Sequence, residues 1–197
     1  MPSQTYDDIA PHYDRGMAPL DRWFLAKLRA ATLRQLPDNA RVLELGAGTG
    51  LNFSYYPSDA KGVATEPNWS MLQIARDKER PSDIQLVQSC AEQLPFADDY
   101  FDVAFATLVF CSVEQPQRAF SELRRVVKPG GKVLLLEHVR PRGLLGPIFD
   151  VLNFFTVNLF ADHFNRQTAT EARKSGLELE NVEQRFFGII NLISCRV

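Results

Sequence analysis

A short apolar segment that runs into a glycine turn is the part of this sequence best suited to bind a ligand. The segment Arg41–Leu45 is rich in residues typical of a buried parallel strand, and Gly46–Gly50 follows it with three glycines. Glycine lets the backbone turn sharply and lie against a ligand. A dinucleotide site would space its glycines as G-x-G-x-x-G, but the residue at the third glycine position is Leu51. The observed G-x-G-x-G spacing, with Glu44 ahead of it, predicts a site for another nucleoside-containing cofactor.

A second acid lies at the distance expected in a strand–helix–strand unit. Lys61–Glu66 has the pattern of a short strand that ends in a carboxylate, and Glu66 follows Glu44 by 22 residues (66 − 44). From the end of a neighbouring strand, Glu66 would accept hydrogen bonds from both ribose hydroxyls of an adenosine. The alternative is structural, because Pro67–Ser70 opens a helix and Glu66 would then neighbour its N-cap. The two acids and the glycine spacing favour S-adenosylmethionine over NAD.

These motifs resemble those of the class I S-adenosylmethionine-dependent methyltransferases, and the likeness covers nearly the whole chain. Glu44–Gly50 resembles the first motif of that family, and Glu66 resembles its ribose-binding acid. Three further segments resemble the adenine loop, the fourth strand and the turn into the fifth strand: Cys90–Phe96, Phe101–Ala106 and Val127–Gly131. Where many members carry an Asp for the adenine amino group, this chain has Cys90.

Other segments narrow the resemblance to two branches of the family. Tyr6–Asp14 is similar to the N-terminal lid of the quinone-biosynthesis and lipid methyltransferases. Gly50–Phe53, Thr107–Val113 and Glu137–His138 resemble the methyltransferase-like proteins that methylate alkyl thiols. The resemblance implies S-adenosyl-L-methionine as the cofactor, S-adenosyl-L-homocysteine as its product, and no metal.

The expected cofactor site follows from these motifs. The backbone at Gly46–Gly48 would hold the methionine portion, a helix starting after Gly50 would face its carboxylate, and Glu44 would attract its ammonium group. Met71 would pack on the adenine, although ordinary helix packing explains it equally well, and Ala91 would offer a backbone N–H. The full set of expected cofactor-binding residues is Glu44, Gly46, Ala47, Gly48, Asn52, Glu66, Pro67, Met71, Ala91, Glu92 and Thr107.

The expected catalytic residues are His138, Tyr13 and Tyr6, which would surround the sulfonium if the family topology holds. His138 could take a proton or stabilise a thiolate, or it could be a structural histidine. Cys111 is expected to be a buried small residue rather than a nucleophile. A thiol with a pKa of ~8.5 is partly ionised at neutral pH, whereas an alkyl ammonium at ~10.4 must first lose a proton. A small lipophilic thiol is therefore the expected acceptor.

Two groups of alternatives stay open at this point. Within the same chemistry, the acceptor could be the headgroup of phosphatidylethanolamine, methylated on nitrogen, or a quinone. In a different class, the chain could be a cofactor-binding regulatory subunit without catalysis. The Asn/Asp-Pro-Pro-Tyr motif of methyltransferases that act on planar nitrogens is absent from the end of the fourth strand, at Thr107–Phe110.

Length and composition set the remaining limits. A chain of 197 residues, 45% hydrophobic, fits one α/β domain, residues 1–197, in which 1–36 form a lid and entry helix. The net charge of −2 and the interspersed basic residues argue against nucleic-acid partners; Arg29, Arg34, Arg124, Arg125 and Lys128 are expected on solvated helix faces or ends. Three cysteines without metal spacing and a polar N-terminus favour a cytoplasmic protein. The oligomeric state is left open.

The elements that would position these residues alternate along the chain. Leu20–Leu36 has the pattern of an entry helix, and strands are expected at 41–45, 61–66, 84–88, 101–106 and 132–137, with helices near 50–56, 68–79 and 115–127. This alternation predicts a parallel sheet with helices on both faces. Leu177–Glu183 and Ile189–Val197 predict a C-terminal antiparallel hairpin. With the resemblance, the expected fold is a Rossmann-like, seven-stranded, mostly parallel sheet.

The aromatic stretch Leu144–Phe164 has an apolar surface wider than one core contact requires. It contains Asp150, Asn153 and Asp162, so it is a poor membrane-spanning helix. At this place, between the fifth strand and the hairpin, the resemblance implies a substrate-covering insertion, residues 140–167, which would form the wall of a lipophilic pocket. A core helix, a dimer interface and a peripheral contact with a membrane remain alternatives.

Overall fold

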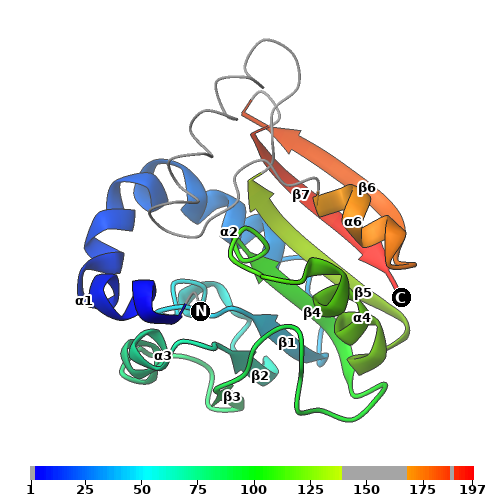
Figure 1. The fold of residues 1–197 in the computed structure, drawn as a ribbon, viewed down its shortest axis with the longest axis horizontal. Helices are drawn as coiled ribbons and strands as arrows, with labels where there is room; N and C mark the ends of the chain where they lie inside the picture. Colours follow the sequence, from blue (N-terminus) through cyan, green and yellow to red (C-terminus); the bar gives the residue numbers. More distant parts are fainter. Residues whose placement is uncertain (1–2, 139–167, 187–188) are drawn as a thin grey trace.

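A helical arm leads into an alternation of strands and helices in the computed structural model (Figure 1), which describes residues 3–138, 168–186 and 189–197. Side chains are described from residue 7 onward. In chain order the elements are α1 (Ser3–Leu20), the π-helix η1 (Asp21–Leu25), α2 (Ala26–Leu33), β1 (Arg41–Leu45), the 3₁₀-helix η2 (Phe53–Tyr55), β2 (Lys61–Thr65), α3 (Trp69–Arg76), β3 (Ile84–Val87), β4 (Phe101–Thr107), α4 (Pro116–Val126), β5 (Val127–His138), α6 (Thr168–Lys174), β6 (Glu178–Arg185) and β7 (Ile190–Arg196).

The strands form one seven-stranded sheet in the order β3-β2-β1-β4-β5-β7-β6. The pairs from β3 to β5 are parallel, whereas β7 lies antiparallel between β5 and β6. The Rossmann-like fold predicted from the sequence, with its C-terminal antiparallel hairpin, is therefore confirmed. The strand order reverses at β1 and β4, and ligands of open α/β sheets bind at such a switch point, beyond the carboxyl ends of the strands.

The core occupies both faces of the sheet because successive strand residues point to opposite sides. On one face, Leu43 and Leu45 belong to a cluster that includes Phe120 and Leu123 of α4. On the other, Val42 belongs to a cluster that includes Leu33 of α2 and residues of the segment after the glycine turn. Both faces are thus covered by helices, so the turn at the end of β1 rests on a strand that is packed on each side.

Two elements differ from the sequence prediction in a way that matters for the site. The helix expected near 50–56 is only the three-residue η2. The entry helix is continuous with α1 through the π-helix η1, since the caps on both sides of η1 keep helical backbone angles. Helices α1 and α2 are therefore parts of one continuous helical segment.

The expected substrate-covering insertion, residues 140–167, lies outside the described residues. Among the helices that the structure does describe, none combines the length and the apolarity that crossing a membrane requires.

Candidate functional site

A cavity of about 540 Å³ lies at the carboxyl ends of β1, β2 and β4. Such a volume falls in the usual range for small-molecule sites. Of the residues expected at the site from the sequence, ten line this cavity: Tyr13, Gly46, Ala47, Gly48, Glu66, Pro67, Met71, Ala91, Glu92 and Thr107. The structure thus brings together segments that are up to 94 residues apart in the chain (107 − 13).

The glycine turn after β1 needs its glycines for two different reasons. Gly46 has φ +64°, and a Cβ there would lie 2.6 Å from a methyl carbon of Val109, so this glycine lets the turn pack against the loop after β4. Gly48 has φ +57°, but a Cβ there would meet no atom within 4 Å. Because Gly48 lines the cavity, a side chain at this position would project into space that a ligand could fill.

Glu66, which immediately follows β2, places its carboxylate beside the glycine turn. Oε2 accepts a hydrogen bond from the Gly48 N–H at 2.9 Å, and Oε1 accepts one from the Asn68 N–H, also at 2.9 Å. Burial raises the pKa of this carboxyl above its ordinary value, while the two backbone hydrogen bonds act in the opposite direction. A carboxylate has roughly four acceptor sites, so about two remain for a ligand.

A buried polar network supports the floor of the cavity from below. Glu44 is fully buried; its Oε1 accepts from Asn52 Nδ2 at 2.6 Å and its Oε2 from the Tyr56 hydroxyl at 2.7 Å. Asn52 Nδ2 also donates to the Thr107 hydroxyl at 2.8 Å. Burial raises the pKa of Glu44 from 4.5 to about 7, although its hydrogen bonds and the charge of Arg29 lower it. Neither Glu44 nor Asn52, both expected to bind the cofactor, lines the cavity; they lie behind its wall, where their network holds Thr107 and Arg29.

Arg29 of α2 is a wall residue that the sequence placed on a solvated face, and that expectation is wrong. Its exposed fraction is only 4%, and it lines the cavity. Nη1 donates to Asn52 Oδ1 and to the Thr107 hydroxyl, each at 2.9 Å, and Nε donates to Asp21 Oδ1 at 2.9 Å. A lone arginine between helical leucines carries no sequence signal for burial, since its partners lie as far as 78 residues away.

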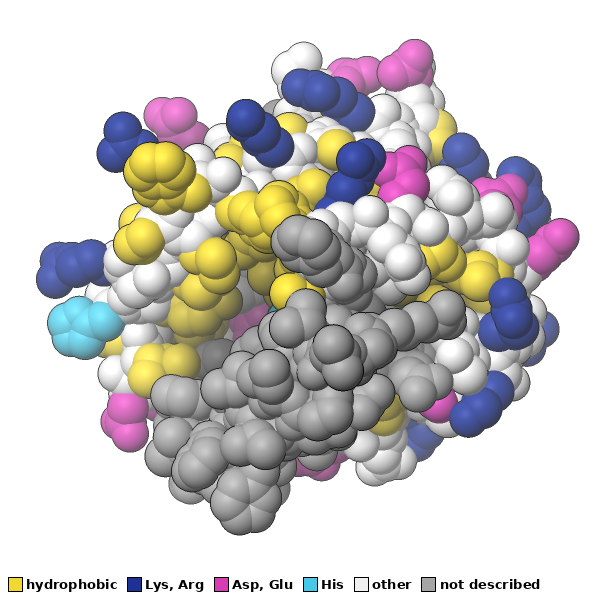
Figure 2. All heavy atoms as spheres, turned by 90° about the horizontal axis from the view of Figure 1, so that it is seen from above, with side chains coloured by type: hydrophobic (Ala, Val, Ile, Leu, Met, Phe, Trp, Pro, Cys, Tyr) yellow, Lys and Arg dark blue, Asp and Glu magenta, His cyan; other side chains and the backbone are white. Residues whose placement is uncertain are grey.

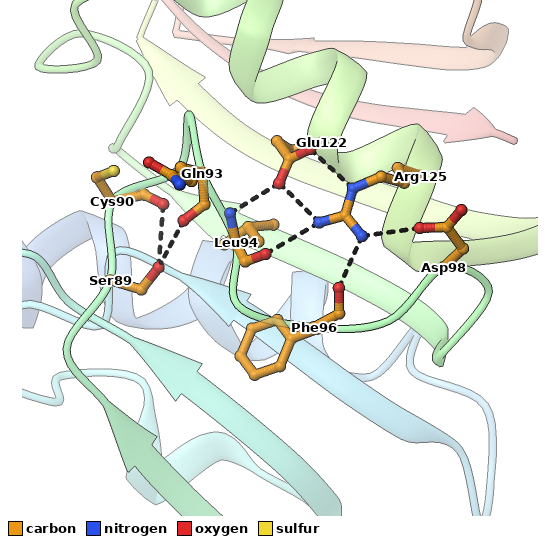
Figure 3. A network of polar contacts seen from close by, with 8 residues as sticks. All are labelled: Ser89, Cys90, Gln93, Leu94, Phe96, Asp98, Glu122 and Arg125. Carbon is orange, nitrogen blue, oxygen red and sulfur yellow. Dashed lines mark hydrogen bonds and ion pairs between the residues drawn. The ribbon is translucent and has the colours of Figure 1, made fainter.

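The loop that follows β3 forms another wall, and Arg125 of α4 fixes it (Figure 3). Its guanidinium donates to the carbonyl oxygens of Phe96 at 2.7 Å and Leu94 at 2.9 Å, and it pairs with Glu122 and Asp98. Glu122 in turn accepts from the Leu94 N–H at 2.7 Å. Arg125 is therefore only half-solvated, and it holds the loop whose earlier residues, Ser89–Gln93, line the cavity.

Helix α1 lies across the cavity and is attached to it by two aspartates seven residues apart. Asp7 accepts from Asn68 Nδ2 at 2.9 Å and from the Ser70 hydroxyl at 2.8 Å. Asp14 accepts from the Thr49 hydroxyl in the glycine turn and pairs with Lys78. Both contacts join the helix to residues that line or flank the cavity, namely the glycine turn and the start and end of α3.

The loop after β4 forms an apolar part of the wall, through Leu108, Val109 and Val113. Leu108 has φ +59°, a conformation that costs a side-chain-bearing residue about 1 kcal/mol or more. The buried carboxylate of Glu137 stabilises this turn, because Oε1 accepts the N–H groups of Val109 at 3.0 Å and Phe110 at 3.2 Å. In the sequence, Glu137 is part of a motif that resembles the family, but the sequence does not indicate that it shapes the cavity wall.

Of the two expected catalytic residues whose side chains the structure describes, Tyr13 lines the cavity and His138 does not. His138 is half-buried at the end of β5, opposite Ile190 of β7, and does not line it. Tyr6 lies in α1, but its side chain is outside the described part of the chain. Cys111 is buried, as expected, and the cysteine in the wall is the exposed Cys90.

One face of the molecule gathers many hydrophobic side chains, as Figure 2 shows beside the residues drawn in grey. Large hydrophobic side chains that are exposed include Leu20 at the end of α1 and Trp23 of η1, whose exposed fractions are 51% and 82%. The helical arm next to the cavity therefore has an apolar surface.

Comparison with known proteins identifies methyltransferases as relatives of this chain. A family model for a methyltransferase domain matches residues 43–135. Demethylmenaquinone methyltransferase of Renibacterium salmoninarum is 31% identical over 170 residues, which cover 83% of this chain and 69% of that protein. A ubiquinone/menaquinone biosynthesis C-methyltransferase of Vibrio campbellii is 40% identical over 129 residues, 60% of this chain and 48% of that protein. A thiol S-methyltransferase of Mus musculus is 34% identical over 117 residues, 56% and 48% of the two chains.

The chain spans about half the length of most of these curated relatives, 48% for the Vibrio and mouse proteins. Among solved structures, an S-adenosylmethionine-dependent methyltransferase of Thermotoga maritima superposes with a TM-score of 0.75 at 21% identity, covering 98% of each chain. This likeness shows that the two chains share a fold.

Proposed function

The chain belongs to the family of S-adenosylmethionine-dependent methyltransferases, and we propose that it transfers a methyl group from this cofactor to a small lipophilic acceptor, with a thiol as the first candidate. The observation that carries the proposal is one cavity whose wall combines the glycine turn, the Glu66 carboxylate and an apolar loop after β4. The first two features suit the cofactor, and the third suits the acceptor.

The residues present fit the cofactor. The open space beside Gly48 leaves room for the methionine portion against the backbone. The two acceptor sites that Glu66 retains match the two hydroxyls of a ribose. The loop Ser89–Gln93, fixed through Arg125, provides a wall for the adenine, with Met71 on another side.

When bound, the cofactor supplies an activated methyl group on its sulfonium, so the protein needs few catalytic side chains. The Gly46–Gly48 backbone and Glu66 would fix the donor's position, and positioning alone accounts for a large part of the rate of such transfers. Helix α1, attached through Asp7 and Asp14, would exclude water from the cavity. Tyr13 faces the cavity from this helix and would contact the acceptor.

A thiol acceptor is favoured by what this wall contains. Among the described residues that line the cavity there is no histidine and no lysine, and Leu108, Val109 and Val113 are apolar. A thiol with a pKa of ~8.5 is partly ionised at neutral pH and makes the least demand on a base. His138 does not line the cavity, so it would assist only indirectly or after a movement of β5. The mouse relative is a thiol S-methyltransferase.

A quinol is the second candidate, because the demethylmenaquinone methyltransferase matches 83% of this chain, more than the thiol S-methyltransferase does. The two candidates share a lipophilic acceptor, but they differ in the atom that receives the methyl group. They can therefore be separated by the product.

The test is the rate of methyl transfer to alkyl thiols of increasing chain length, with the matched alkyl amines and a naphthoquinol as comparisons. Each buried methylene contributes ~0.8 kcal/mol, so kcat/KM should rise about fourfold per methylene until the cavity is filled. Amines of the same length should react much more slowly. Preferential methylation of the quinol carbon would instead establish the second candidate, and thiol rates that are independent of chain length would contradict a lipophilic site.

A further inference from the structure

Arg29 lies in the cavity wall but belongs to none of the sequence motifs. Its hydrogen bonds leave one edge of the guanidinium without a protein partner among the described residues. Arg29 uses Nε and both N–H groups of Nη1 for its bonds to Asp21, Asn52 and Thr107. Within the part of the chain that the structure describes, Nη2 donates no hydrogen bond, and it is not among the fully enclosed atoms that lack a partner. Because Arg29 is 4% exposed and lines the cavity, the cavity is where its remaining donors can find an acceptor.

The surroundings of Arg29 fix its orientation but leave its charge only partly compensated. Asp21 contacts Nε from η1, and its side chain is itself 18% exposed. Asn52 and Thr107 are neutral, and the buried Glu44 interacts with the charge of Arg29 but is hydrogen-bonded to Asn52 and not to the guanidinium. A buried cation with unused N–H donors is costly unless an anion approaches it. The ligand that this edge fits is therefore an anion with planar acceptor oxygens, such as a carboxylate.

The strand order places this cation at the end of the cavity opposite the adenosine. β2, with Glu66 after it, lies on one side of the glycine turn, and β4, which ends at Thr107, lies on the other. If Glu66 and the loop after β3 hold the adenosine, the amino-acid portion of the cofactor lies across the turn, toward Thr107 and Arg29.

The helix N-terminus that the sequence offered for the cofactor's carboxylate is not available. η2 has three residues, too few for a helix dipole of useful size. The other arginine in the wall, Arg118, is exposed and donates to Gln115, near the loop that lies on the adenosine side. Of the two arginines that the structure describes in the cavity wall, Arg29 is therefore the one placed to bind the carboxylate.

We propose that Arg29 binds the carboxylate of the cofactor's methionine portion and thereby makes the site selective against cofactor analogues that lack this carboxylate. The proposal rests on the proposed function, since it concerns the same cofactor. Asp21, Asn52 and Thr107 are positioning residues that orient the guanidinium for this contact.

The experiment is a cycle of two ligands and two proteins, measured by titration calorimetry. The ligands are S-adenosylhomocysteine and its decarboxylated analogue, in which hydrogen replaces the carboxylate; the proteins are the wild type and Arg29→Met. The wild type should bind the carboxylated ligand about 10- to 100-fold more tightly, the usual range for a hydrogen bond to a charged group. In Arg29→Met this ratio should fall to about one, mainly through weaker binding of the carboxylated ligand.

Equal weakening of both ligands in Arg29→Met would overturn the proposal and assign Arg29 a purely structural role. A wild type that does not distinguish the ligands would overturn it as well, without any need for a variant. Arg118→Met is the matched control and should change both affinities alike. If Arg29→Met does not fold, Arg29→Lys should retain part of the preference. Failure of the wild type to bind S-adenosylhomocysteine at all would count against the proposed function instead.

Discussion

Replacing Glu66 with alanine should weaken binding of S-adenosylhomocysteine by about 2 kcal/mol, which is about 30-fold in Kd. The carboxylate already accepts two backbone N–H groups, from Gly48 and Asn68, so it has about two acceptor sites left for the ribose hydroxyls. Each hydrogen bond to a charged group contributes roughly 1.5–3 kcal/mol, and water that enters the vacated space would recover part of the loss. The remaining difference is the predicted 2 kcal/mol.

The assay is titration calorimetry with the unreactive product, combined with thermal unfolding of each protein. Unfolding is needed because the substitution also removes the acceptor of two loop N–H groups. Asp102→Ala is a matched control, since Asp102 accepts the Arg41 N–H at 2.7 Å and pairs with Lys128, away from the cavity. The control should lose stability but keep its affinity. An affinity of Glu66→Ala within threefold of the wild type would refute the assignment of Glu66 to the ribose.

Three further predictions follow from individual side chains. Burial raises the pKa of Glu44 from 4.5 to about 7, so its contribution to stability is complete below pH 4.5 and is lost as the pH rises to about 7. Glu44→Gln should therefore become more stable than the wild type by on the order of 3 kcal/mol near pH 8, but not near pH 4.5, as measured by urea unfolding at each pH. Cys90 should be the cysteine that a maleimide labels first, because Cys111 and Cys195 are buried. Since Cys90 lines the cavity, saturating S-adenosylhomocysteine should slow its labelling, followed by mass spectrometry, by at least about tenfold. An unchanged labelling rate would mean that the ligand does not bind against this wall. His138→Gln should leave cofactor affinity unchanged, since His138 does not line the cavity, and should lower kcat toward a thiol if it accepts the proton; an unchanged kcat would mean that no base operates there.

Local patterns were enough to predict the strands and the glycine turn. Buried parallel strands have continuous apolar runs, so β1 was predicted with its observed bounds at Arg41–Leu45. The tail was also predictable, because two strand patterns without an intervening helix leave an antiparallel hairpin as the simplest completion of the sheet. Glu66 was found because the spacing of a strand–helix–strand unit is fixed by its geometry.

Long-range polar pairing was not predictable in the same way. Arg29 resembles a solvated helix residue in the sequence, and its burial depends on partners in distant segments, Asn52 and Thr107. Arg125 keeps a partly exposed side chain, as expected, but no local pattern indicates its hydrogen bonds to the carbonyl groups of Leu94 and Phe96. The contraction of the expected helix near 50–56 to η2 depends on the packing of this segment against the sheet. Such features arise only once the chain is folded.

The central claim, that this cavity binds S-adenosylmethionine and delivers its methyl group to a lipophilic thiol, is tested most directly by a single-turnover experiment. The protein is incubated with S-adenosylmethionine that carries an isotopically labelled methyl group, and a long-chain alkyl thiol is then added. The account predicts that the label appears on the sulfur of the thiol, and that Gly48→Val, whose side chain would project into the cavity, abolishes the transfer. Label that stays on a tightly bound cofactor in the presence of thiol, quinol and amine acceptors would contradict the account and would indicate a cofactor-binding subunit without catalysis.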